Sequence, residues 1–260
     1  KGRELLRAVF TPALRKVVGL GGKEQFKLHF HLPPAKSFLR VWRKPGKRDG
    51  GDDISSFRQT VLDVNQKHRP VTGIEIGRGG FVVRGLAPVA GPQGNHLGSV
   101  EFLFPYDKVS EMARARQDEL ASVYMRQKGL AIAARLAAKN PPLVGEFARL
   151  YGTDTKTSDR LVSKDLLQRG FKGLASDRKG DTYLSAMPIR DYQGRSIGVL
   201  VFLRDINAFL SRMEMLRLTL AGGSLALFLL MLVVFWRGSS TVVNRLGEAI
   251  GGLRLMARGN

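Results

Sequence analysis

Alternation of apolar and polar residues predicts several strands in the first half of the chain. Gln25–Leu32 alternates strictly, with four apolar residues on one face and Lys27, His29 and His31 on the other. This is the pattern of a strand whose two faces differ. Turn residues and alternation predict four more strands: Ser37–Trp42, Val71–Gly77, Phe81–Val89 and His96–Phe104. Short turns join the last three, so we expect an antiparallel meander.

Apolar residues spaced three and four positions apart predict helices between and after these strands. One helix should begin at Asp53, an N-cap candidate, and run to about Arg69. A helix–strand–helix region is expected over residues 106–140, where Pro141 and the following proline end it. Residues 143–175 are expected to form helical and loop segments.

A further apolar stripe predicts an N-terminal helix over residues 1–20. Pro12 should kink this helix, and three glycines should end it: Gly19, Gly21 and Gly22. The helix begins at Lys1 without a start signal. We therefore expect a fragment of a longer protein, in which a membrane span could precede this helix.

The chain also contains an internal repeat. RGLAPVAGPQGNHLGSVEFLF (84–104) aligns without a gap with LSAMPIRDYQGRSIGVLVFLR (184–204). Identical pairs occur along the whole alignment: Pro88/Pro188, Gln93/Gln193, Gly94/Gly194, Gly98/Gly198, Phe102/Phe202 and Leu103/Leu203. Each copy has a proline near a strand end, a glycine-containing turn, and a strand that begins with glycine. We interpret this as two tandem copies of one small α+β unit.

The longest apolar segment is Leu218–Trp236, which carries no charge and is flanked by Arg217 and Arg237. At a rise of about 1.5 Å per residue it covers roughly the 30 Å hydrocarbon core of a bilayer. It therefore predicts a transmembrane helix, which an apolar stripe from Ile206 onward should join to the last strand. Beyond it, apolar residues step by three and four as in a coiled-coil seam: Val243, Leu246, Ile250, Leu253 and Ala257.

Composition narrows the function classes. The chain has 260 residues, no cysteine and a formal net charge of +20. Without cysteine there are no disulfides, thiolate nucleophiles or cysteine-based metal sites. The basic residues are spread along the chain and are not interleaved with stacking aromatics, so we do not expect nucleic-acid binding. A basic surface also suits anionic lipid headgroups or anionic ligands.

Several segments resemble the third double-Cache family of bacterial sensors: FHLPPAKSFLRVW (30–42), DDISSFRQTV (52–61), GIEIGRGGFVVRGLAPV (73–89) and GSVEF (98–102). This family is found on methyl-accepting chemotaxis proteins, histidine kinases and diguanylate cyclases. RLGEAIGGLRLMARGN (245–260) is similar to the first helix of a HAMP linker, although Asn244 stands where many HAMP domains carry proline. The resemblance covers nearly the whole chain.

The resemblance implies an α+β fold of two tandem PAS-like Cache domains, each an antiparallel sheet flanked by helices. The expected segments are an N-terminal signalling helix (1–22), a membrane-distal Cache domain (23–105), a membrane-proximal Cache domain (106–205), a juxtamembrane helix (206–217), the transmembrane helix (218–236) and the start of HAMP (237–260). Residues 1–210 would lie in the periplasm and residues 243–260 in the cytoplasm, on either side of a bacterial inner membrane.

Catalytic and metal-binding signatures are weak. GRGG (77–80) lies between two predicted strands, so it predicts a hairpin turn and not a phosphate-binding loop. His29 and His31 on one strand face could begin a metal site. Spacing places no third ligand near them, so we interpret them as two polar residues on one face. We expect no enzymatic activity, no cofactor and no metal in these residues.

The repeat indicates where a ligand could bind. The first copy has Arg84 and Glu101 where the second has Leu184 and Val201. Charges in the middle of a covered sheet are unfavourable unless they are paired or bind something. We therefore expect the ligand in the first copy and interpret the second as a structural relay.

A hairpin that pairs Val89 with His96 would set Arg84 directly opposite Glu101, as a cross-strand ion pair. In the family, the ligand lies in the membrane-distal domain. The predicted pocket lining is Arg40, Trp42, Arg58, Glu75, Arg84 and Glu101. Arginine suits a carboxylate and tryptophan an aromatic wall, whereas the glutamates could hold an amine. The alternative is a set of solvent-facing or mutually neutralising charges.

These features predict the ligand-sensing part of a chemoreceptor of the methyl-accepting type, which forms a homodimer and signals through the membrane to HAMP. Its partners would be a small-molecule ligand, the membrane, and the cytoplasmic signalling partners of an output domain. The sensor module of a histidine kinase or a diguanylate cyclase is an alternative. Another class is a membrane-anchored adhesion or protein-interaction module without a small-molecule ligand, in which Arg84 and Glu101 would be exposed.

Overall fold

The computed structural model describes residues 1–21, 27–46, 49–115, 118–257 and 259. The chain divides into two compact units, residues 1–205 and 206–260, and each is described by itself. Several sequence predictions fall on residues outside the described ranges: Gly22 at the end of the first helix, Gln25 and Phe26 at the start of the first strand, and Arg258 and Asn260 in the HAMP-like segment.

The first unit contains two antiparallel sheets, which confirms the predicted α+β fold. The first sheet has the order β2-β1-β5-β4-β3, with β1 Lys27–Leu32, β2 Lys36–Arg40, β3 Val71–Gly77, β4 Gly80–Ala90 and β5 His96–Pro105. The predicted meander is confirmed in β3, β4 and β5. The strand predicted over Ser37–Trp42 ends earlier, at Arg40, because Trp42 already lies in a turn.

The second sheet has the order β7-β8-β6-β11-β10-β9. Its strands are β6 Leu120–Arg126, β7 Leu143–Val144, β8 Phe147–Gly152, β9 Ala175–Lys179, β10 Thr182–Arg190 and β11 Ser196–Asp205. The helix–strand–helix region is confirmed as α3 Tyr106–Met112, β6, the 3₁₀ helix η1 Gln127–Ala131 and α4 Ala134–Ala137.

The prediction of helices and loops over residues 143–175 is wrong for β7 and β8. The sequence of β8, FARLYG, does not alternate between apolar and polar residues, so its pairing with β6 and β7 is not visible in the pattern. The rest of the segment contains the expected helices, α5 Thr155–Leu161 and α6 Lys164–Lys172.

The sequence repeat corresponds to two hairpins with the same geometry. β4–β5 and β10–β11 both carry a bulge close to the turn, after Val89 in one and after Ile189 in the other. Gly98 and Gly198 pair with these residues, and each lies against the neighbouring strand. A Cβ atom there would be 2.0 Å (Gly98) or 2.4 Å (Gly198) from a backbone carbonyl oxygen. Close backbone approach therefore requires glycine in both copies.

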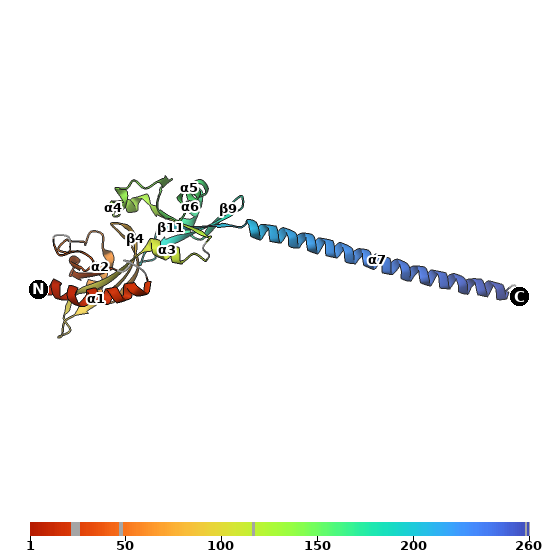
Figure 1. Ribbon diagram of the computed structural model, residues 1–260, viewed down its shortest axis with the longest axis horizontal. Coiled ribbons are helices and arrows are strands. Elements are labelled where there is room, and N and C mark those ends of the chain that lie inside the picture. The colour runs from red at the N-terminus through yellow and green to blue at the C-terminus, as the bar shows by residue number, and fades with distance from the viewer. Residues whose placement is uncertain (22–26, 47–48, 116–117, 258, 260) are drawn as a thin grey trace. The chain divides into compact units, whose positions relative to one another are not determined.

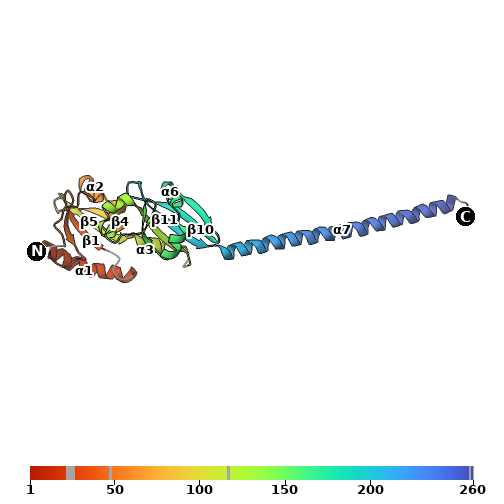
Figure 2. The same ribbon diagram turned by 90° about the horizontal axis from the view of Figure 1, so that it is seen from above.

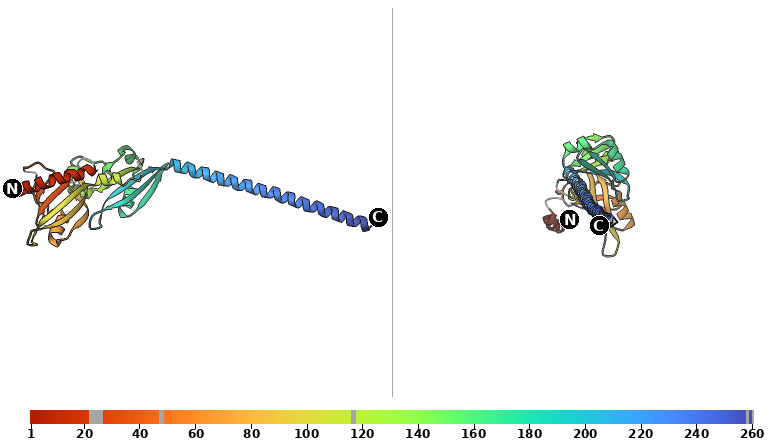
Figure 3. Two further views of the ribbon diagram at one scale, coloured as in Figure 1. Left: turned by 60° about the horizontal axis from the view of Figure 1, so that its bottom comes forward. Right: turned by 90° about the vertical axis from the view of Figure 1, so that its right-hand side faces the viewer.

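Helices cover both sheets with apolar side chains. α1 (Gly2–Gly21) lies along the first sheet (Figure 3, left). Its Leu6, Phe10 and Leu14 pack against side chains of β1 and β2. α2 (Gln59–Lys67) contributes Val61 and Val64 to the core above β4. In the second sheet α6 lies against β10 and β11 (Figure 2). Its Leu166 and Leu167 are fully buried.

The helix predicted from Asp53 to Arg69 is shorter, because α2 begins at Gln59 and ends at Lys67. Asp53 instead forms an isolated β-bridge with Lys36 and accepts the backbone N–H of Ser55 at 2.8 Å. Asp53 is therefore not the N-cap. The first turn of α2 is instead capped by a carboxylate from another strand, which is described with the site below.

The two sheets of the first unit are in direct contact. Phe81 of β4 shares a core cluster with residues of the second sheet, among them Val123 and Ile189. The turn between β10 and β11 lies against β3, where the backbone N–H of Tyr192 donates to the carbonyl of Ile74 at 3.0 Å. These contacts connect the two copies of the repeat.

The second unit is α7 (Asn207–Ala257), a single helix of 51 residues (Figure 1). It contains the predicted transmembrane segment 218–236, whose large apolar side chains are exposed. In the described part of the chain, this is the one helix long and apolar enough to cross a membrane.

Candidate functional site

The first sheet buries charges at the positions where the second sheet buries a hydrophobic core. Arg84 on β4 is 3% exposed and Glu101 on β5 is 0% exposed. Their counterparts in the second copy, Leu184 and Val201, are also 0% exposed and belong to an apolar cluster. The protein-interaction alternative required Arg84 and Glu101 to be exposed, and they are not.

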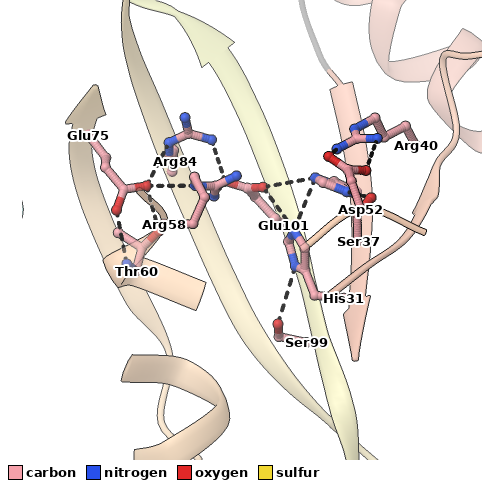
Figure 4. A network of polar contacts seen from close by, with 11 residues as sticks. His31, Ser37, Arg40, Asp52, Arg58, Thr60, Glu75, Arg84, Ser99 and Glu101 are labelled. Atoms are coloured by element: carbon pink, nitrogen blue, oxygen red, sulfur yellow. Dashed lines mark hydrogen bonds and ion pairs between the residues drawn. The ribbon is translucent and has the colours of Figure 1, made fainter. Parts of the chain in front are cut away.

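Four charged side chains form what we call the charged cluster: Arg58, Glu75, Arg84 and Glu101 (Figure 4). Arg58 donates from Nε to Glu75 at 2.8 Å and from Nη2 to Glu101 at 2.5 Å. Arg84 donates from Nη1 to Glu101 at 2.7 Å, and its Nε lies 3.2 Å from Glu75. Two arginines and two glutamates thus neutralise one another, which is what buried charges require.

Glu75 also explains where α2 begins. Its carboxylate accepts the backbone N–H of Thr60 at 3.0 Å and the Thr60 hydroxyl at 2.8 Å. Thr60 lies in the first turn of α2, where backbone N–H groups lack partners within the helix. The N-cap residue Arg58 makes no side-chain cap bond. A carboxylate from β3 therefore caps α2, and it also places Arg58 over the sheet.

The predicted ion pair between Arg84 and Glu101 is confirmed, but the predicted register of strands β4 and β5 is wrong. Ala90 and not Val89 lies opposite His96, and the bulge after Val89 shifts the register by one further residue, so that Arg84 lies opposite Leu103 and Glu101 lies opposite Leu86. Arg84 and Glu101 are diagonal neighbours on one face, still close enough for long side chains to meet. Burial alone would raise the pKa of Glu101, but the charges of Arg58 and Arg84 outweigh it and hold the pKa well below its ordinary value.

A pair of histidines on β1 adjoins the charged cluster. His29 lies directly opposite Glu101, and His31 lies opposite Ser99. Both rings are buried, and burial lowers the pKa of His29 to about 3 and also lowers that of His31. Both imidazoles are therefore neutral at physiological pH. One nitrogen of each ring and one oxygen of Glu101 all lie within 4.8 Å of one another, so these three residues could hold a metal ion.

A cavity of about 810 Å³ opens beside this cluster. This volume is in the range of small-molecule sites. Its basic lining residues outnumber its acidic ones: Lys27, Arg40, Arg43, Arg58, Arg78, Arg84 and Arg135 against Asp52 and Asp107. Trp42, Phe57 and Phe81 supply aromatic walls.

Four of the six predicted pocket residues line this cavity: Arg40, Trp42, Arg58 and Arg84. Arg40 forms a two-bonded ion pair with Asp52, with N–O distances of 2.7 and 2.8 Å. Trp42 meets the ring of His29 edge to face, with the ring centres 5.7 Å apart. Glu75 and Glu101 do not line the cavity and lie behind Arg58 and Arg84.

Sequence reasoning missed several residues of the cavity wall. Arg43 and Asp52 lie in the loop after β2, Arg78 lies in the β3–β4 turn, and Arg135 comes from α4 in another part of the chain. No local pattern joins these positions. The one signal available was the His29-x-His31 pair, which the sequence alone could not connect to Glu101.

Two of the missed residues show what the cavity wall offers. Among the described residues, the buried Nε of Arg43 has no hydrogen-bond partner. The guanidinium of Arg78 lies over the ring of Phe57, 5.0 Å from its centre, where the ring attracts its positive charge. The wall therefore presents N–H donors and positive charge.

Comparisons with solved structures return distant similarities. An extracellular ligand-binding receptor from Desulfohalobium retbaense is 12% identical (TM-score 0.39), and the match covers 74% of this chain but only 32% of that one. The ligand-binding domain of the Campylobacter jejuni chemoreceptor Tlp3, in complex with L-norvaline, is 8% identical (75% and 68% covered, TM-score 0.38). That of the Pseudomonas aeruginosa amino acid chemoreceptor PctC, in complex with GABA, is 11% identical (68% and 70% covered, TM-score 0.34).

The chain spans about a third of the length of the Desulfohalobium receptor. No curated protein sequence shows a significant match to the chain described here. The sequence pattern of one family, dCache_3, does match, and the match extends over residues 19–210. These residues include both sheets, the charged cluster and the cavity. The chain therefore belongs to the third double-Cache family, the double sensory domain of two-component sensor kinases.

Proposed function

We propose that this chain is the ligand-sensing and transmembrane part of a bacterial receptor, and that the cavity beside the charged cluster binds a small organic anion. The single observation that carries the proposal is the arginine-rich wall of this 810 Å³ cavity. Arg58 and Arg84 are held in place by Glu75 and Glu101, so their geometry is set before a ligand arrives.

The charge of the wall favours an anion over an amine. Asp52 already binds Arg40 through both carboxylate oxygens. Glu75 and Glu101 lie behind the wall and are paired with Arg58 and Arg84. An amine could bind these carboxylates only by displacing the two arginines. Arg43, with a buried Nε that lacks a partner among the described residues, supplies a donor for a carboxylate.

A physical route leads from the cavity to the second sheet. Arg58, in the cavity wall, immediately precedes α2. Further along α2, Asp63 accepts a hydrogen bond from the hydroxyl of Tyr192 at 3.1 Å. Tyr192 lies in the β10–β11 turn, and β11 leads directly in sequence to α7. A ligand that moves Arg58 would shift α2. The contact between Asp63 and Tyr192 would pass this shift to the β10–β11 hairpin, which precedes α7 in the sequence.

The output follows from the same proposal. α7 would cross the inner membrane at 218–236, with residues 1–210 in the periplasm and 243–260 as the first HAMP helix of a homodimer. The output domain would be that of a chemotaxis transducer. The alternatives are a sensor histidine kinase and a diguanylate cyclase, and the description of the matching family supports the kinase among these two. The coding sequence beyond Asn260 distinguishes them, because methylation heptads or a catalytic domain would follow.

Binding can be tested by the thermal stability of the full chain in detergent, screened against organic acids, amino acids, amines and purines. A ligand at 100 times its Kd should stabilise the protein by about 2.7 kcal/mol. We expect an organic acid to do so. Arg43→Gln removes a charged donor from the wall and should raise the Kd about 10-fold or more, because hydrogen bonds to charged groups contribute about 1.5–3 kcal/mol.

The matched control is Arg160→Gln, which removes the same charge from an exposed position that does not line the cavity. It should bind the acid like the unchanged protein. Stabilisation by amines alone would contradict an anionic ligand. An acid that binds Arg43→Gln and Arg160→Gln equally would place the site outside this cavity.

A further inference from the structure

We infer that His29, His31 and Glu101 form a binding site for a divalent transition-metal ion of the zinc class. The three ligand atoms are Nδ1 of His29, Nε2 of His31 and Oε2 of Glu101. They form a compact triangle with sides of 3.0 Å between the two nitrogens, 3.6 Å from His29 to Glu101 and 3.5 Å from His31 to Glu101. The inference does not depend on the anion proposed for the cavity.

The size of this triangle matches a metal site. A tetrahedral ion with ligands at about 2.0–2.1 Å holds neighbouring ligand atoms roughly 3.3 Å apart. The three observed separations lie on both sides of that value. Two imidazole nitrogens and one carboxylate oxygen suit zinc and its neighbours in the first transition row, whereas magnesium and calcium prefer oxygen ligands throughout.

The outer nitrogens of both rings are already occupied. His29 Nε2 lies 2.7 Å from the hydroxyl of Ser37. His31 Nδ1 lies 3.3 Å from the hydroxyl of Ser99, and Figure 4 shows this second contact. With the ring N–H donated outward to each serine, the inner nitrogens carry lone pairs directed toward Glu101. Metal-binding histidines are typically oriented by such an outward hydrogen bond.

Glu101 supplies an independent observation. Its Oε1 accepts bonds from both Arg58 and Arg84, but its Oε2 accepts none from the described residues, although the side chain is 0% exposed. A fully buried carboxylate oxygen without a partner is costly. In the tautomers that donate outward to both serines, no proton lies between the two inner nitrogens, which are 3.0 Å apart, and a metal ion would satisfy the lone pairs of both nitrogens and of Oε2.

Arg58 and Arg84 are neutralised by Glu75 and Glu101, so the charged cluster has no net charge to repel the ion, although the cavity wall beside it is basic. The nearest part of the site, His29, lines the cavity, which provides a path for the ion. A fourth ligand, water or another small molecule, could therefore reach the metal from the cavity side.

The test uses the full chain in detergent, purified without a histidine tag, stripped with a chelator and titrated with Co²⁺ alone. Tetrahedral Co²⁺ has strong visible absorption bands, and we expect these bands to saturate at one ion per chain and to disappear when Zn²⁺ is added. His31→Gln removes a ligand. It should weaken Co²⁺ binding by more than about 100-fold, because even loss of an orienting partner costs about 10–100-fold.

The matched control is His96→Gln. His96 belongs to the other histidine pair of the chain, in which the rings of His68 and His96 stack 4.1 Å apart away from this site. This variant should bind Co²⁺ like the unchanged protein. If His31→Gln does not fold, Ser99→Ala replaces it and should weaken binding about 10–100-fold. Failure of the unchanged protein to take up Co²⁺, or equal binding by the His31 or Ser99 variant and His96→Gln, would overturn the inference.

Discussion

At the scale of single residues, the charged cluster is costly in isolation and stable only as a set. Moving charges from water into a sheet costs several kcal/mol per ion, and mutual attraction offsets that cost only when every charge is paired. Arg58, Glu75, Arg84 and Glu101 meet this condition, since each is bonded to two opposite charges. The second copy, with Leu184 and Val201 at two of these positions, shows that the hairpin itself folds without them.

The second copy therefore suggests a mutant cycle. Arg84→Leu or Glu101→Val alone leaves an unbalanced buried charge and should destabilise the protein by about 3–5 kcal/mol. The double variant Arg84→Leu/Glu101→Val recreates the pair found in the second copy and leaves Arg58 paired with Glu75. We expect its free energy of unfolding to be close to that of the unchanged protein, measured by thermal melting of all four proteins.

The cycle measures whether the effects of the Arg84 and Glu101 substitutions on the free energy of unfolding are coupled. If the two single effects simply add in the double variant, the charges act independently, and the balanced cluster is not the reason for their stability. If the double variant is stable but no longer responds to the ligand, the charges serve binding and not folding.

At the scale of elements, α2 connects the two sheets of the first unit. Its first turn is capped by Glu75 of β3, the preceding Arg58 reaches the cavity, and its Asp63 bonds Tyr192 of the second sheet. Gly73 on β3 leaves room for that turn, because a Cβ atom there would lie 2.5 Å from the Cβ of Tyr192. A shift of α2 would therefore change contacts with both sheets.

The contact of Asp63 should make this connection sensitive to acid. Burial raises the pKa of Asp63, but hydrogen bonds from Gln59, Lys67 and Tyr192 outweigh it, so the folded-state pKa lies below the ordinary value. A carboxyl with a lowered pKa stabilises the folded state above its unfolded pKa of about 3.9 and loses that effect as the pH falls through the folded pKa. Asp63→Asn should cost about 1 kcal/mol near pH 7 and progressively less below about pH 4.

Melting temperatures of both proteins across this pH range test the prediction. Asp181→Asn, which changes an exposed aspartate beside the β9–β10 turn, is the matched control and should have little effect at any pH. A constant difference between the unchanged protein and Asp63→Asn from neutral to acid pH would mean that the Asp63 carboxylate does not stabilise the contact.

At the scale of the whole molecule, α7 is the one helix of the described residues that is long and apolar enough to cross a membrane. A helix of 51 residues is about 75 Å long, more than twice the roughly 30 Å of a hydrocarbon core. It can therefore cross a bilayer within 218–236 and extend beyond it at both ends. Because it is one continuous helix, a displacement at its first residues is carried along its length, which a flexible linker would not do.

Membrane insertion can be tested with charges placed in the middle of this segment. Leu227→Arg/Leu230→Arg should prevent stable insertion, because each arginine near the bilayer centre costs about 2.5–3.5 kcal/mol. We expect this variant to be released from bacterial membranes by alkaline carbonate, whereas the unchanged protein stays in the membrane fraction.

The matched control places the same pair of changes further along α7, as Val243→Arg/Leu246→Arg. It should remain in the membrane, since these positions lie beyond the span. Retention of both variants would show that 218–236 is not the segment that anchors the chain.

The sequence by itself determined the features that depend on local pattern. Alternation predicted β3, β4 and β5, the long uncharged run predicted the apolar helix, and the punctuation of the repeat predicted two hairpins of one type. It also predicted that Arg84 and Glu101 would pair, because charges stood where the other copy had apolar residues. Such signals are visible because neighbouring residues share one element.

Only the tertiary structure decided what depends on contacts between distant segments. A carboxylate from β3 caps α2, which begins at Gln59 and not at Asp53, and the pairing of Ala90 with His96 together with a bulge sets the register around Glu101. The approach of His29 and His31 to Glu101, and of Arg43 and Arg135 to one cavity, likewise has no local signature. The physical reason is that folding brings together side chains from different elements, and spacing within any one element carries no record of that contact.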